Sequence, residues 1–305
     1  MYVDIGTSVD DLRRFFPKSK EEIMMEPNPV EIFGAYSSWK VSEDTWIINF
    51  MNGSQNMYLL EGEDCALLID TGWGAGNLRA FVQKLTSKHI ITALTHGHLD
   101  HSGGCGEWEE VMMLPGGEGD LFTCHRLPFD VSTLPYPNFA HKIVHDGDRI
   151  DLGSRVIKLL DISAHSNGSL CFLDRKNGYL FVGDELESAQ VLMYETEKIP
   201  GYSFELDERL RAHYANMCRL KALEGEWNTI FPAHNGAPIA HFYLDDYIAL
   251  TEKIYAGKAV IEDKLNHKYA EAGDSEHKLC RVRWGGASFF VNKGDMMALY
   301  GTNAL

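Results

Sequence analysis

The sequence contains no long hydrophobic run. No stretch approaches the roughly eighteen uncharged apolar residues of a membrane-spanning helix, so we expect no such helix. Residues 1–6 include the acid Asp4 and lack a long apolar core, which is not the pattern of a secretory signal. We therefore expect a cytoplasmic protein.

Basic residues are scarce relative to acidic ones. The chain has 28 Lys and Arg against 44 Asp and Glu, which gives a formal net charge of -16 at pH 7. Nucleic-acid phosphates and anionic membrane surfaces both attract basic side chains. The composition therefore predicts no nucleic-acid partner and no membrane partner, and it indicates a solvated acidic surface that favours solubility.

Cysteine is sparse too, with 6 residues in 305. No two of them form a Cys-x-x-Cys pair, and the chain is long enough to build a core without a disulfide framework. We interpret them as reduced thiols. Cys105 lies close in sequence to the histidine cluster described below, and we favour a small packed residue there over a reactive one.

What the sequence does contain is a series of short apolar, β-branched segments separated by turn residues. These predict strands at residues 45–50, 57–60, 65–69, 90–94, 155–161, 170–173, 179–182, 229–231 and 288–291. Helical spacing of apolar residues predicts helices at 75–87 and 205–223, and the chain after 236 is predicted to be helical to about residue 272. Because strands and helices occur in both halves, the order indicates a sandwich of sheets covered by helices.

Four metal-ligating side chains stand within six consecutive positions: His96, His98, Asp100 and His101. The chain has only 13 histidines, so chance is a poor explanation of this density. Imidazole and carboxylate are ligands that borderline-soft divalent metals prefer. The cluster directly follows the predicted strand 90–94, and strand ends of layered α/β folds are where active sites tend to lie.

The spacing within this cluster points to two metal positions. His96 and His98 are two residues apart and share a face if the chain stays extended. Asp100 and His101 follow in a turn, or in the first turn of a helix, and can point to a second position. The alternative is a polar loop of histidines satisfied by hydrogen bonds, because short motifs produce false positives.

Each metal position needs about three protein ligands, with one position left open for water. Three later residues qualify because each sits just beyond a predicted strand: His165, Asp184 and His234. Taken singly, each is more typical of a structural or surface residue. Together with the first cluster they form a coherent ligand set.

At these residues the sequence resembles the metallo-β-lactamase fold superfamily, and within it the glyoxalase II-like dinuclear hydrolases. The shared marks occur in the family's order: Leu-Ile-Asp-Thr-Gly at 68–72, Thr-His-Gly-His-Leu-Asp-His at 95–101, Asp-Gly-Asp at 146–148, His165, Gly-Asp at 183–184, and His234. There is one departure. Ser163 and Ala164 stand where the family usually has Pro-Gly before the third histidine, which affects the local turn rather than the ligation.

The resemblance implies an α+β fold, the αββα sandwich of the metallo-β-lactamase type with extra C-terminal helices. It covers roughly residues 45–240, which form the catalytic domain, with a helical insertion near 185–228. Residues 1–44 are then an N-terminal extension. Residues 241–305 are a C-terminal helical segment that completes the domain.

The resemblance also implies a role for each candidate ligand. All seven would bind divalent ions, in two sets joined by one carboxylate: His96, His98 and His165 for the first ion, Asp100, His101 and His234 for the second, and Asp184 between them. Asp70 would orient the ligand loop, a role that matters nearly as much as ligation, or would cap the loop through backbone hydrogen bonds. Two zinc ions are expected, with iron or manganese as alternatives.

The expected reaction is hydrolysis by a metal-bridging hydroxide, because two ions roughly 3.5 to 4 Å apart can share and activate one water. Asp100 and Asp184 are the candidate catalytic residues that hold or shuttle a proton. The expected partner is a small ester-like molecule, with a thioester or a lactone favoured. A homodimer is a further expectation, with Phe289 and Phe290 either in its interface or closing the cleft.

Three other functions are left open at this point. A phosphodiesterase would use the same two ions. An iron-dependent redox enzyme similar to the sulfur dioxygenases would use only His96, His98 and His165. A non-enzymatic metal-binding sensor on the same fold is the least favoured, because a degenerate relative is expected to lose ligands and all seven are present.

Overall fold

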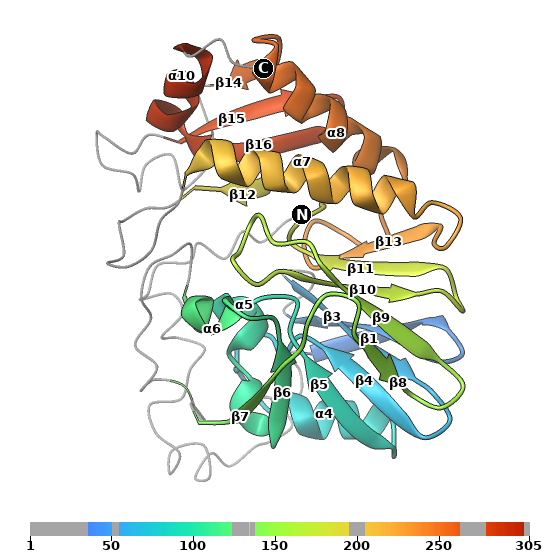
Figure 1. The fold of residues 1–305 in the computed structure, drawn as a ribbon. Helices are drawn as coiled ribbons and strands as arrows, with labels where there is room; N and C mark the ends of the chain where they lie inside the picture. The colour runs from blue at the N-terminus through green and yellow to red at the C-terminus, as the bar shows by residue number, and fades with distance from the viewer. Residues whose placement is uncertain are drawn as a thin grey trace.

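A computed structural model of the chain describes residues 36–50, 55–123, 134, 138–194, 205–262 and 279–301. Residues 1–35, most of the predicted N-terminal extension, lie outside the described residues. The described part is built of layered sheets with helices between and outside them (Figure 1).

The strands in order along the chain are β1 (Tyr36–Ser42), β2 (Thr45–Phe50), β3 (Gln55–Glu61), β4 (Cys65–Ile69), β5 (His89–Ala93), β6 (Glu110–Met113), β7 (Ala140–Ile143), β8 (Arg149–Asp151), β9 (Val156–Asp161), β10 (Leu170–Asp174), β11 (Tyr179–Gly183), β12 (Val191–Met193), β13 (Thr229–Pro232), β14 (Val260–Glu262), β15 (Leu279–Trp284) and β16 (Ala287–Asn292). Every strand predicted from the sequence is confirmed, with shifts of a few residues at the ends.

The helices are α4 (Leu78–Leu85), α5 (Leu99–Ser102), α6 (Gly117–Asp120), α7 (Leu206–Ala222), α8 (Phe242–Tyr255) and α10 (Lys293–Gly301), with a 3-10 turn at Cys105–Glu107. The predicted helices at 75–87 and 205–223 are confirmed as α4 and α7. Across the described ranges, none of these helices combines the length and apolar character needed to cross a bilayer.

The strands form three sheets. The first has seven strands in the order β1-β2-β3-β4-β5-β6-β7, the second has five in the order β13-β11-β10-β9-β8, and the third has four in the order β12-β16-β15-β14. The first sheet is antiparallel from β1 to β4 and parallel from β4 to β7. In the second sheet, β11 and β13 run parallel.

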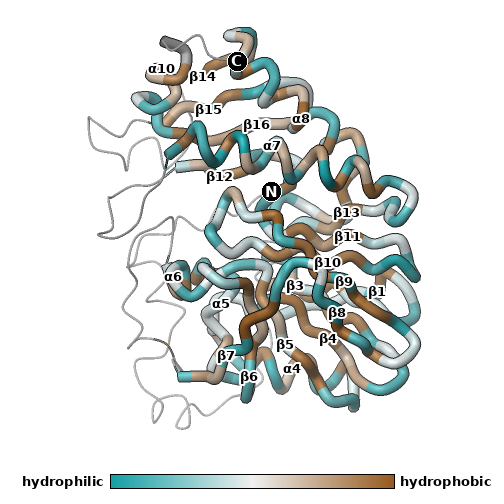
Figure 2. Tube along the Cα trace, in the orientation of Figure 1, coloured by the Kyte–Doolittle hydropathy of each residue, from teal (hydrophilic) through white to brown (hydrophobic). Residues whose placement is uncertain are grey.

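The first sheet is covered on both faces, so its central strands are buried along their whole length. In β3, Met57 and Leu59 belong to one core, whereas Tyr58 and Leu60 belong to another that they share with the second sheet. The Tyr58 ring lies 4.8 Å from that of Phe181 in β11. Burial on both faces explains why these strands are continuous apolar runs, which Figure 2 shows as hydrophobic colour in the middle of the molecule.

Helices cover the outer faces of the two sheets. Helix α4 packs Leu78 and Val82 against the first sheet. Helices α7 and α8 cover the second sheet, with Leu210 and Leu250 in the same core as Leu180 of β11. The predicted αββα sandwich is therefore the central part of the fold.

The C-terminal part differs from the sequence prediction. Within the predicted helical segment 241–305 the sequence indicated one strand, at 288–291, which is confirmed as β16, but the described residues of this segment also contain β14 and β15, and the predicted helical insertion at 185–228 supplies β12 to the same sheet. The third sheet packs with α7 and α8 in one core, and Figure 1 shows its strands beside these two helices at the C-terminal end of the molecule. The sequence signal for it was the two-glycine turn Gly285-Gly286, which joins β15 to β16.

Two further expectations are corrected. A strand, β1, lies within the predicted N-terminal extension and pairs with β2, so the first sheet begins earlier than residue 45. Phe289 and Phe290 are buried inside the chain, where Phe289 packs against His213 and Tyr247. Neither ring is therefore available for a dimer interface.

A buried arginine connects the two central sheets. Arg155 has 0% of its surface exposed and binds Asp174 at the end of β10, with Nε and Nη2 at 2.8 and 2.6 Å from one carboxylate oxygen. Its Nη1 donates to the carbonyl of Asp44 at 2.9 Å, and its Nη2 donates to Oγ1 of Thr45 at 2.9 Å. Those two residues lie at the β1–β2 hairpin of the first sheet, so one side chain ties the sheets together.

Replacing Arg155 with alanine is expected to lower the free energy of unfolding by about 3–5 kcal/mol, because Asp174 is left as a buried, uncompensated charge. Urea unfolding followed by circular dichroism measures the change. The matched control is Arg175→Ala, which breaks the exposed pair with Glu226 and is expected to cost no more than about 1 kcal/mol. Equal costs in the two variants would contradict the role assigned to Arg155.

Candidate metal centre

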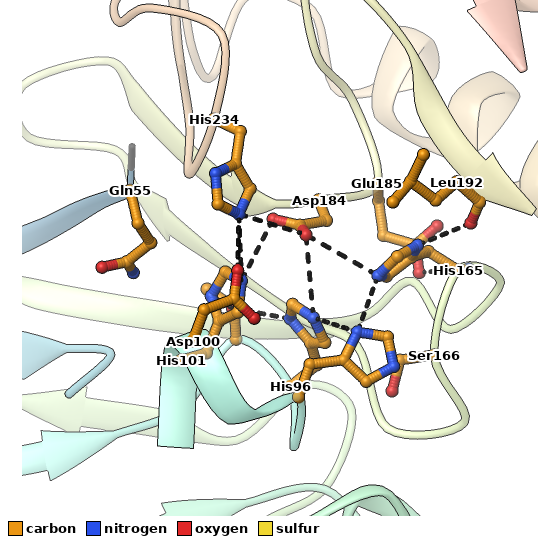
Figure 3. Close-up of polar contacts among 12 residues, drawn as sticks. Gln55, His96, Asp100, His101, His165, Ser166, Asp184, Glu185, Leu192 and His234 are labelled. Carbon is orange, nitrogen blue, oxygen red and sulfur yellow. Dashed lines mark hydrogen bonds and ion pairs between the residues drawn. The ribbon is translucent and has the colours of Figure 1, made fainter. Parts of the chain in front are cut away.

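The candidate ligands all follow the carboxyl ends of strands from the two central sheets. Strands β4 and β5 lead into Asp70 and the 95–101 segment, and β9, β11 and β13 lead into the later ligands. These ends meet at one edge of the sandwich, so the loops converge. Figure 3 shows the side chains pointing toward one another there.

The first group consists of three imidazoles. Nδ1 of His98 lies 3.0 Å from Nε2 of His96 and 3.0 Å from Nε2 of His165. All three side chains are buried. The predicted proximity of His96 and His98 is thus confirmed, and His165 joins them from the second sheet.

The second group consists of Asp100, His101 and His234. Helix α5 begins at Leu99, so Asp100 and His101 stand in its first turn, one of the two placements expected from the sequence. Nε2 of His234 lies 3.1 Å from Oδ2 of Asp100 and 3.3 Å from Nε2 of His101. These donor atoms lie within 4.8 Å of one another.

Asp184 lies between the two groups. Its Oδ2 is 3.8 Å from Nε2 of His96 and 3.7 Å from Nε2 of His165 in the first group, and 3.5 Å from Nε2 of His234 in the second. Its Oδ1 is 3.4 Å from Nε2 of His101. The structure therefore brings all seven predicted residues together.

Hydrogen bonds on the outer side of two rings fix which nitrogen faces the centre. Nδ1 of His165 donates to the carbonyl of Leu192 at 2.7 Å, and Nδ1 of His101 donates to Oδ2 of Asp70 at 2.8 Å. In the neutral ring, a proton on Nδ1 leaves the lone pair on Nε2. Both rings therefore present an acceptor nitrogen toward the other candidate ligands, as metal-ligating histidines do.

Asp70 makes the contacts that both roles considered for it require. Its Oδ1 accepts from the backbone N–H of Thr95 at 2.6 Å, and its Oδ2 accepts from the Thr95 hydroxyl at 2.9 Å as well as from His101. Its φ of 65° lies in the left-handed region, a conformation that persists only where surrounding contacts hold it. One carboxylate thus caps the loop and orients a candidate ligand.

The charges of the centre are strongly coupled. Burial opposes ionisation of Asp184, but His234 and His101 outweigh burial and bring its pKa down to about 2. Burial opposes protonation of His234, but Asp184 and Asp100 outweigh it and raise its pKa to about 10. The pKa of His96 shifts in the opposite direction. Burial and the neighbouring His101 and His98 push it well below its usual value.

This donor set suits a divalent cation. Neutral imidazole nitrogens and ionised carboxylates are the ligands that zinc, manganese and iron accept, and here seven of them form three overlapping groups of three. Three imidazole nitrogens that approach to 3.0 Å need a proton or a cation between their lone pairs. The residues present therefore fit one or two metal ions.

The unusual turn before His165 is held by side chains that the sequence analysis missed. Oε1 of Glu185 accepts from the N–H groups of Ala164 and His165 at 2.9 and 2.7 Å. Asp120, which ends α6, accepts from the Ser166 hydroxyl at 2.6 Å. These contacts replace the usual Pro-Gly as the means of shaping the turn.

Glu185 and Glu187 are the acidic residues nearest in sequence to Asp184, and both are buried. Burial raises the pKa of Glu185 to about 7. Burial and the Asp184 carboxylate raise the pKa of Glu187 well above its usual value. The signal for them was the polar-apolar-polar order of Glu185-Leu186-Glu187 directly after Asp184, in a segment that the sequence analysis treated only as the start of a helical insertion.

Cys105 is a packed residue, as favoured from the sequence. It is fully buried, and its sulfur lies 3.6 Å from the hydroxyl of Thr71 behind the ligand loop. In the part of the chain that the structure describes, the cysteines are free thiols.

Comparison with protein families identifies the class. Residues 51–258 match the model of the metallo-beta-lactamase superfamily, which is more than half of the 305 residues. The chain belongs to this superfamily.

Relatives with assigned names match a shorter stretch. The acyl-coenzyme A thioesterase MBLAC2 of Homo sapiens is 26% identical over 159 residues, 42% of this chain and 57% of that protein. A hydroxyacylglutathione hydrolase of Francisella philomiragia is 27% identical over 195 residues, 62% of this chain and 66% of that protein. The chain thus spans between half and two thirds of the length of these curated relatives.

Solved structures support the fold. The Rm3 metallo-beta-lactamase aligns with a TM-score of 0.53 at 16% identity, over 74% of this chain and 95% of that one. A B3 metallo-beta-lactamase with an active-site glutamic acid aligns with a TM-score of 0.54 at 16% identity, over 77% and 96%. At this identity the likeness concerns the fold alone.

Replacing Asp70 with asparagine is expected to lower the free energy of unfolding of the metal-free protein by about 1–3 kcal/mol. Asparagine tolerates the left-handed backbone, but its NH2 group cannot accept a hydrogen bond, so a buried donor from Thr95 or His101 loses its partner. Urea unfolding in the presence of a chelator measures the change. Asp64→Asn, at an exposed position, is the control and is expected to stay within about 0.5 kcal/mol.

Proposed function

We propose that this protein is a hydrolase that uses two divalent metal ions, zinc first among them, to cleave a small thioester or lactone. The observation that carries the proposal is the pair of ligand groups that share Asp184, each with three donor atoms within 4.8 Å of one another. A single structural ion would not require a second complete group beside the first.

The choice of a thioester is supported by the names of the relatives. One is an acyl-coenzyme A thioesterase, and another, from Aspergillus fumigatus, is an atrochrysone carboxyl ACP thioesterase at 24% identity over 175 residues. A lactone stays within the proposal because its carbonyl undergoes the same addition. The low identities leave the acyl group and its carrier to experiment.

The ions, when bound, would polarise the substrate carbonyl and lower the pKa of a bound water to about 7. The residues supply positioning and proton handling. Oδ2 of Asp100 lies 3.1 Å from Nε2 of His234, and both side chains are 20% exposed. Asp100 is therefore placed to hold a proton at Oδ2 on the side of the centre that solvent reaches.

The exposed fractions also indicate the side from which substrate enters. His96 and His101 are only 1% and 0% exposed, whereas Asp100 and His234 keep part of their surface in contact with solvent. A substrate therefore meets the Asp100–His234 side first. Asp184, behind them, is the candidate for holding a proton deeper in the site.

A small-molecule substrate, a cytoplasmic location and a homodimer belong to the same proposal. The acidic composition supports the first by disfavouring nucleic acid and anionic membranes as partners. Phe289 and Phe290 no longer support the homodimer, since both rings are buried within one chain.

Elemental analysis of gently purified protein is expected to find about two zinc or manganese ions per chain. His98→Ala and Asp184→Ala are each expected to lower that content, because each removes a candidate ligand. His89→Ala, at the exposed start of β5, is the matched control and should keep the full content. Unchanged metal in both ligand variants would contradict the ligand assignment.

The identity and number of the bound metal ions also distinguish the proposed hydrolase from the redox alternative. About one iron per chain would favour a redox enzyme that uses only His96, His98 and His165, because these three form a complete group by themselves. Oxygen consumption with thiol or persulfide substrates would then test that function in place of hydrolysis.

Hydrolysis of generic thioesters, lactones and phosphodiesters by the zinc-loaded protein is expected to be fastest with a thioester. The rate of His98→Ala and of Asp184→Ala is expected to fall below about a hundredth of wild type, since the ions no longer polarise the carbonyl together. Release of free thiol, followed with a thiol reagent, measures the rate, and His89→Ala again serves as the control. A preference for phosphodiesters would overturn the substrate class.

A further inference from the structure

The segment that follows Asp184 carries two buried carboxylates that are not ligands in the proposed centre. Glu185 is 1% exposed and Glu187 is 4% exposed. Leu186 between them is fully buried in the core that contains α7 and α8. Two acids in such positions need partners, because burying an unpaired carboxylate is costly.

Glu185 is directed to the loop that carries His165. Its Oε1 accepts from two successive backbone N–H groups, those of Ala164 and His165, at 2.9 and 2.7 Å. The ring of His165 is held on its other side by the carbonyl of Leu192. Figure 3 shows Glu185 behind His165, away from the donor atoms that converge with Asp184.

Helix α7 fixes both partners of this contact. Arg209 donates from Nη1 to the carbonyl of Ala164 at 3.0 Å, and His213 donates from Nε2 to the carbonyl of Glu185 at 2.7 Å. The two residues are four apart, so they lie on one face of the helix. The backbone on each side of the Glu185 carboxylate is therefore anchored to the same rigid element.

Glu187 is directed to the other histidine loop. Its Oε2 accepts from Nδ2 of Asn235, the residue after His234. Ser188 donates its hydroxyl to the carbonyl of Asn235 at 2.6 Å. Asn235 has a φ of 61°, which lies in the left-handed region, and the contacts with Glu187 and Ser188 hold its backbone there.

We propose that Glu185 and Glu187 are positioning residues that act on separate halves of the centre. Glu185 sets the position of His165 for the group of three histidines, whereas Glu187, with Ser188, sets the position of His234 for the group with Asp100 and His101. The inference rests on the proposed function in one respect, namely that both groups bind metal.

The geometry makes these residues acceptors of hydrogen bonds rather than sources of charge. A single oxygen of Glu185 accepts both N–H groups, so the amide oxygen of glutamine can take its place. Alanine removes the acceptor, and aspartate keeps the charge but is one methylene too short to reach. Substitution with glutamine should therefore preserve the affinity for metal, whereas substitution with alanine or aspartate should lower it.

Titration of the metal-free full-length protein with cobalt(II), followed by its visible absorption, tests the inference without any substrate. In wild type we expect two equivalents to bind. In Glu185→Ala and Glu187→Ala we expect one of the two dissociation constants to rise by about 10- to 100-fold, the usual effect of losing a partner behind a ligand. Glu185→Gln and Glu187→Gln should stay close to wild type, as should Glu208→Ala at an exposed position of α7.

Two further variants, each of which lacks one ligand group, identify the group that each glutamate positions. His98→Ala leaves the group with His234, and there Glu187→Ala should weaken cobalt binding while Glu185→Ala should not. Asp100→Ala leaves the group of three histidines, and there the effects should be reversed. The cobalt absorption band, which depends on ligand geometry, should shift in the affected half only.

Thermal melting of each metal-free variant shows whether it folds. Where an alanine variant does not fold, the aspartate variant at the same position takes its place with the same expected loss. Two bound equivalents with no difference between the glutamate variants and Glu208→Ala would overturn the inference alone. Equal weakening of both halves, or no rescue by glutamine, would overturn it as well, whereas a wild-type protein that binds no cobalt would overturn it together with the proposed function.

Discussion

The site depends on the contact between the two central sheets at Thr95. The backbone N–H and hydroxyl of this residue bind Asp70 in the first sheet, and its carbonyl accepts from the N–H of Leu170 in the second sheet at 2.6 Å. Gly183 lies against its side chain, so close that a Cβ there would come within 2.7 Å of the Cβ of Thr95. Histidines from one sheet can therefore meet Asp184 from the other only because position 183 has no side chain.

Electrostatic interactions set the charges of the side chains in the centre. Asp184 and Asp100 stabilise a positive charge on the imidazoles around them, while burial and neighbouring rings keep His96 neutral. The buried pair of Arg155 and Asp174 ties the same two sheets together at a separate position.

The sequence predicted the features that depend on local pattern. The strands, helix α7 and the converging histidines follow from apolar periodicity and from ligand spacing, whereas the role of Asp70 was implied by the family resemblance. Of the third sheet the sequence indicated β16 alone, because β12 and β14 have three residues each and β12 pairs with a strand that lies far away in the sequence. Glu185 was missed because its partners, the N–H groups of the His165 loop, are backbone atoms, and pairing with backbone atoms leaves no mark in the sequence.

Helix α7 has a consequence for how the molecule responds to a bound ion. Its Arg209 and His213 anchor the His165 loop and the backbone of Glu185, and its buried apolar side chains pack in the core shared with the third sheet. Any free energy that an ion contributes by holding His165 is therefore transmitted to the C-terminal layer, and by reciprocity the stability of that layer contributes to affinity for the ion. The outermost sheet, which also holds the His165 ring through the Leu192 carbonyl of β12, is thus thermodynamically linked to the metal site, and slower amide exchange in β15 and β16 would report that an ion is bound.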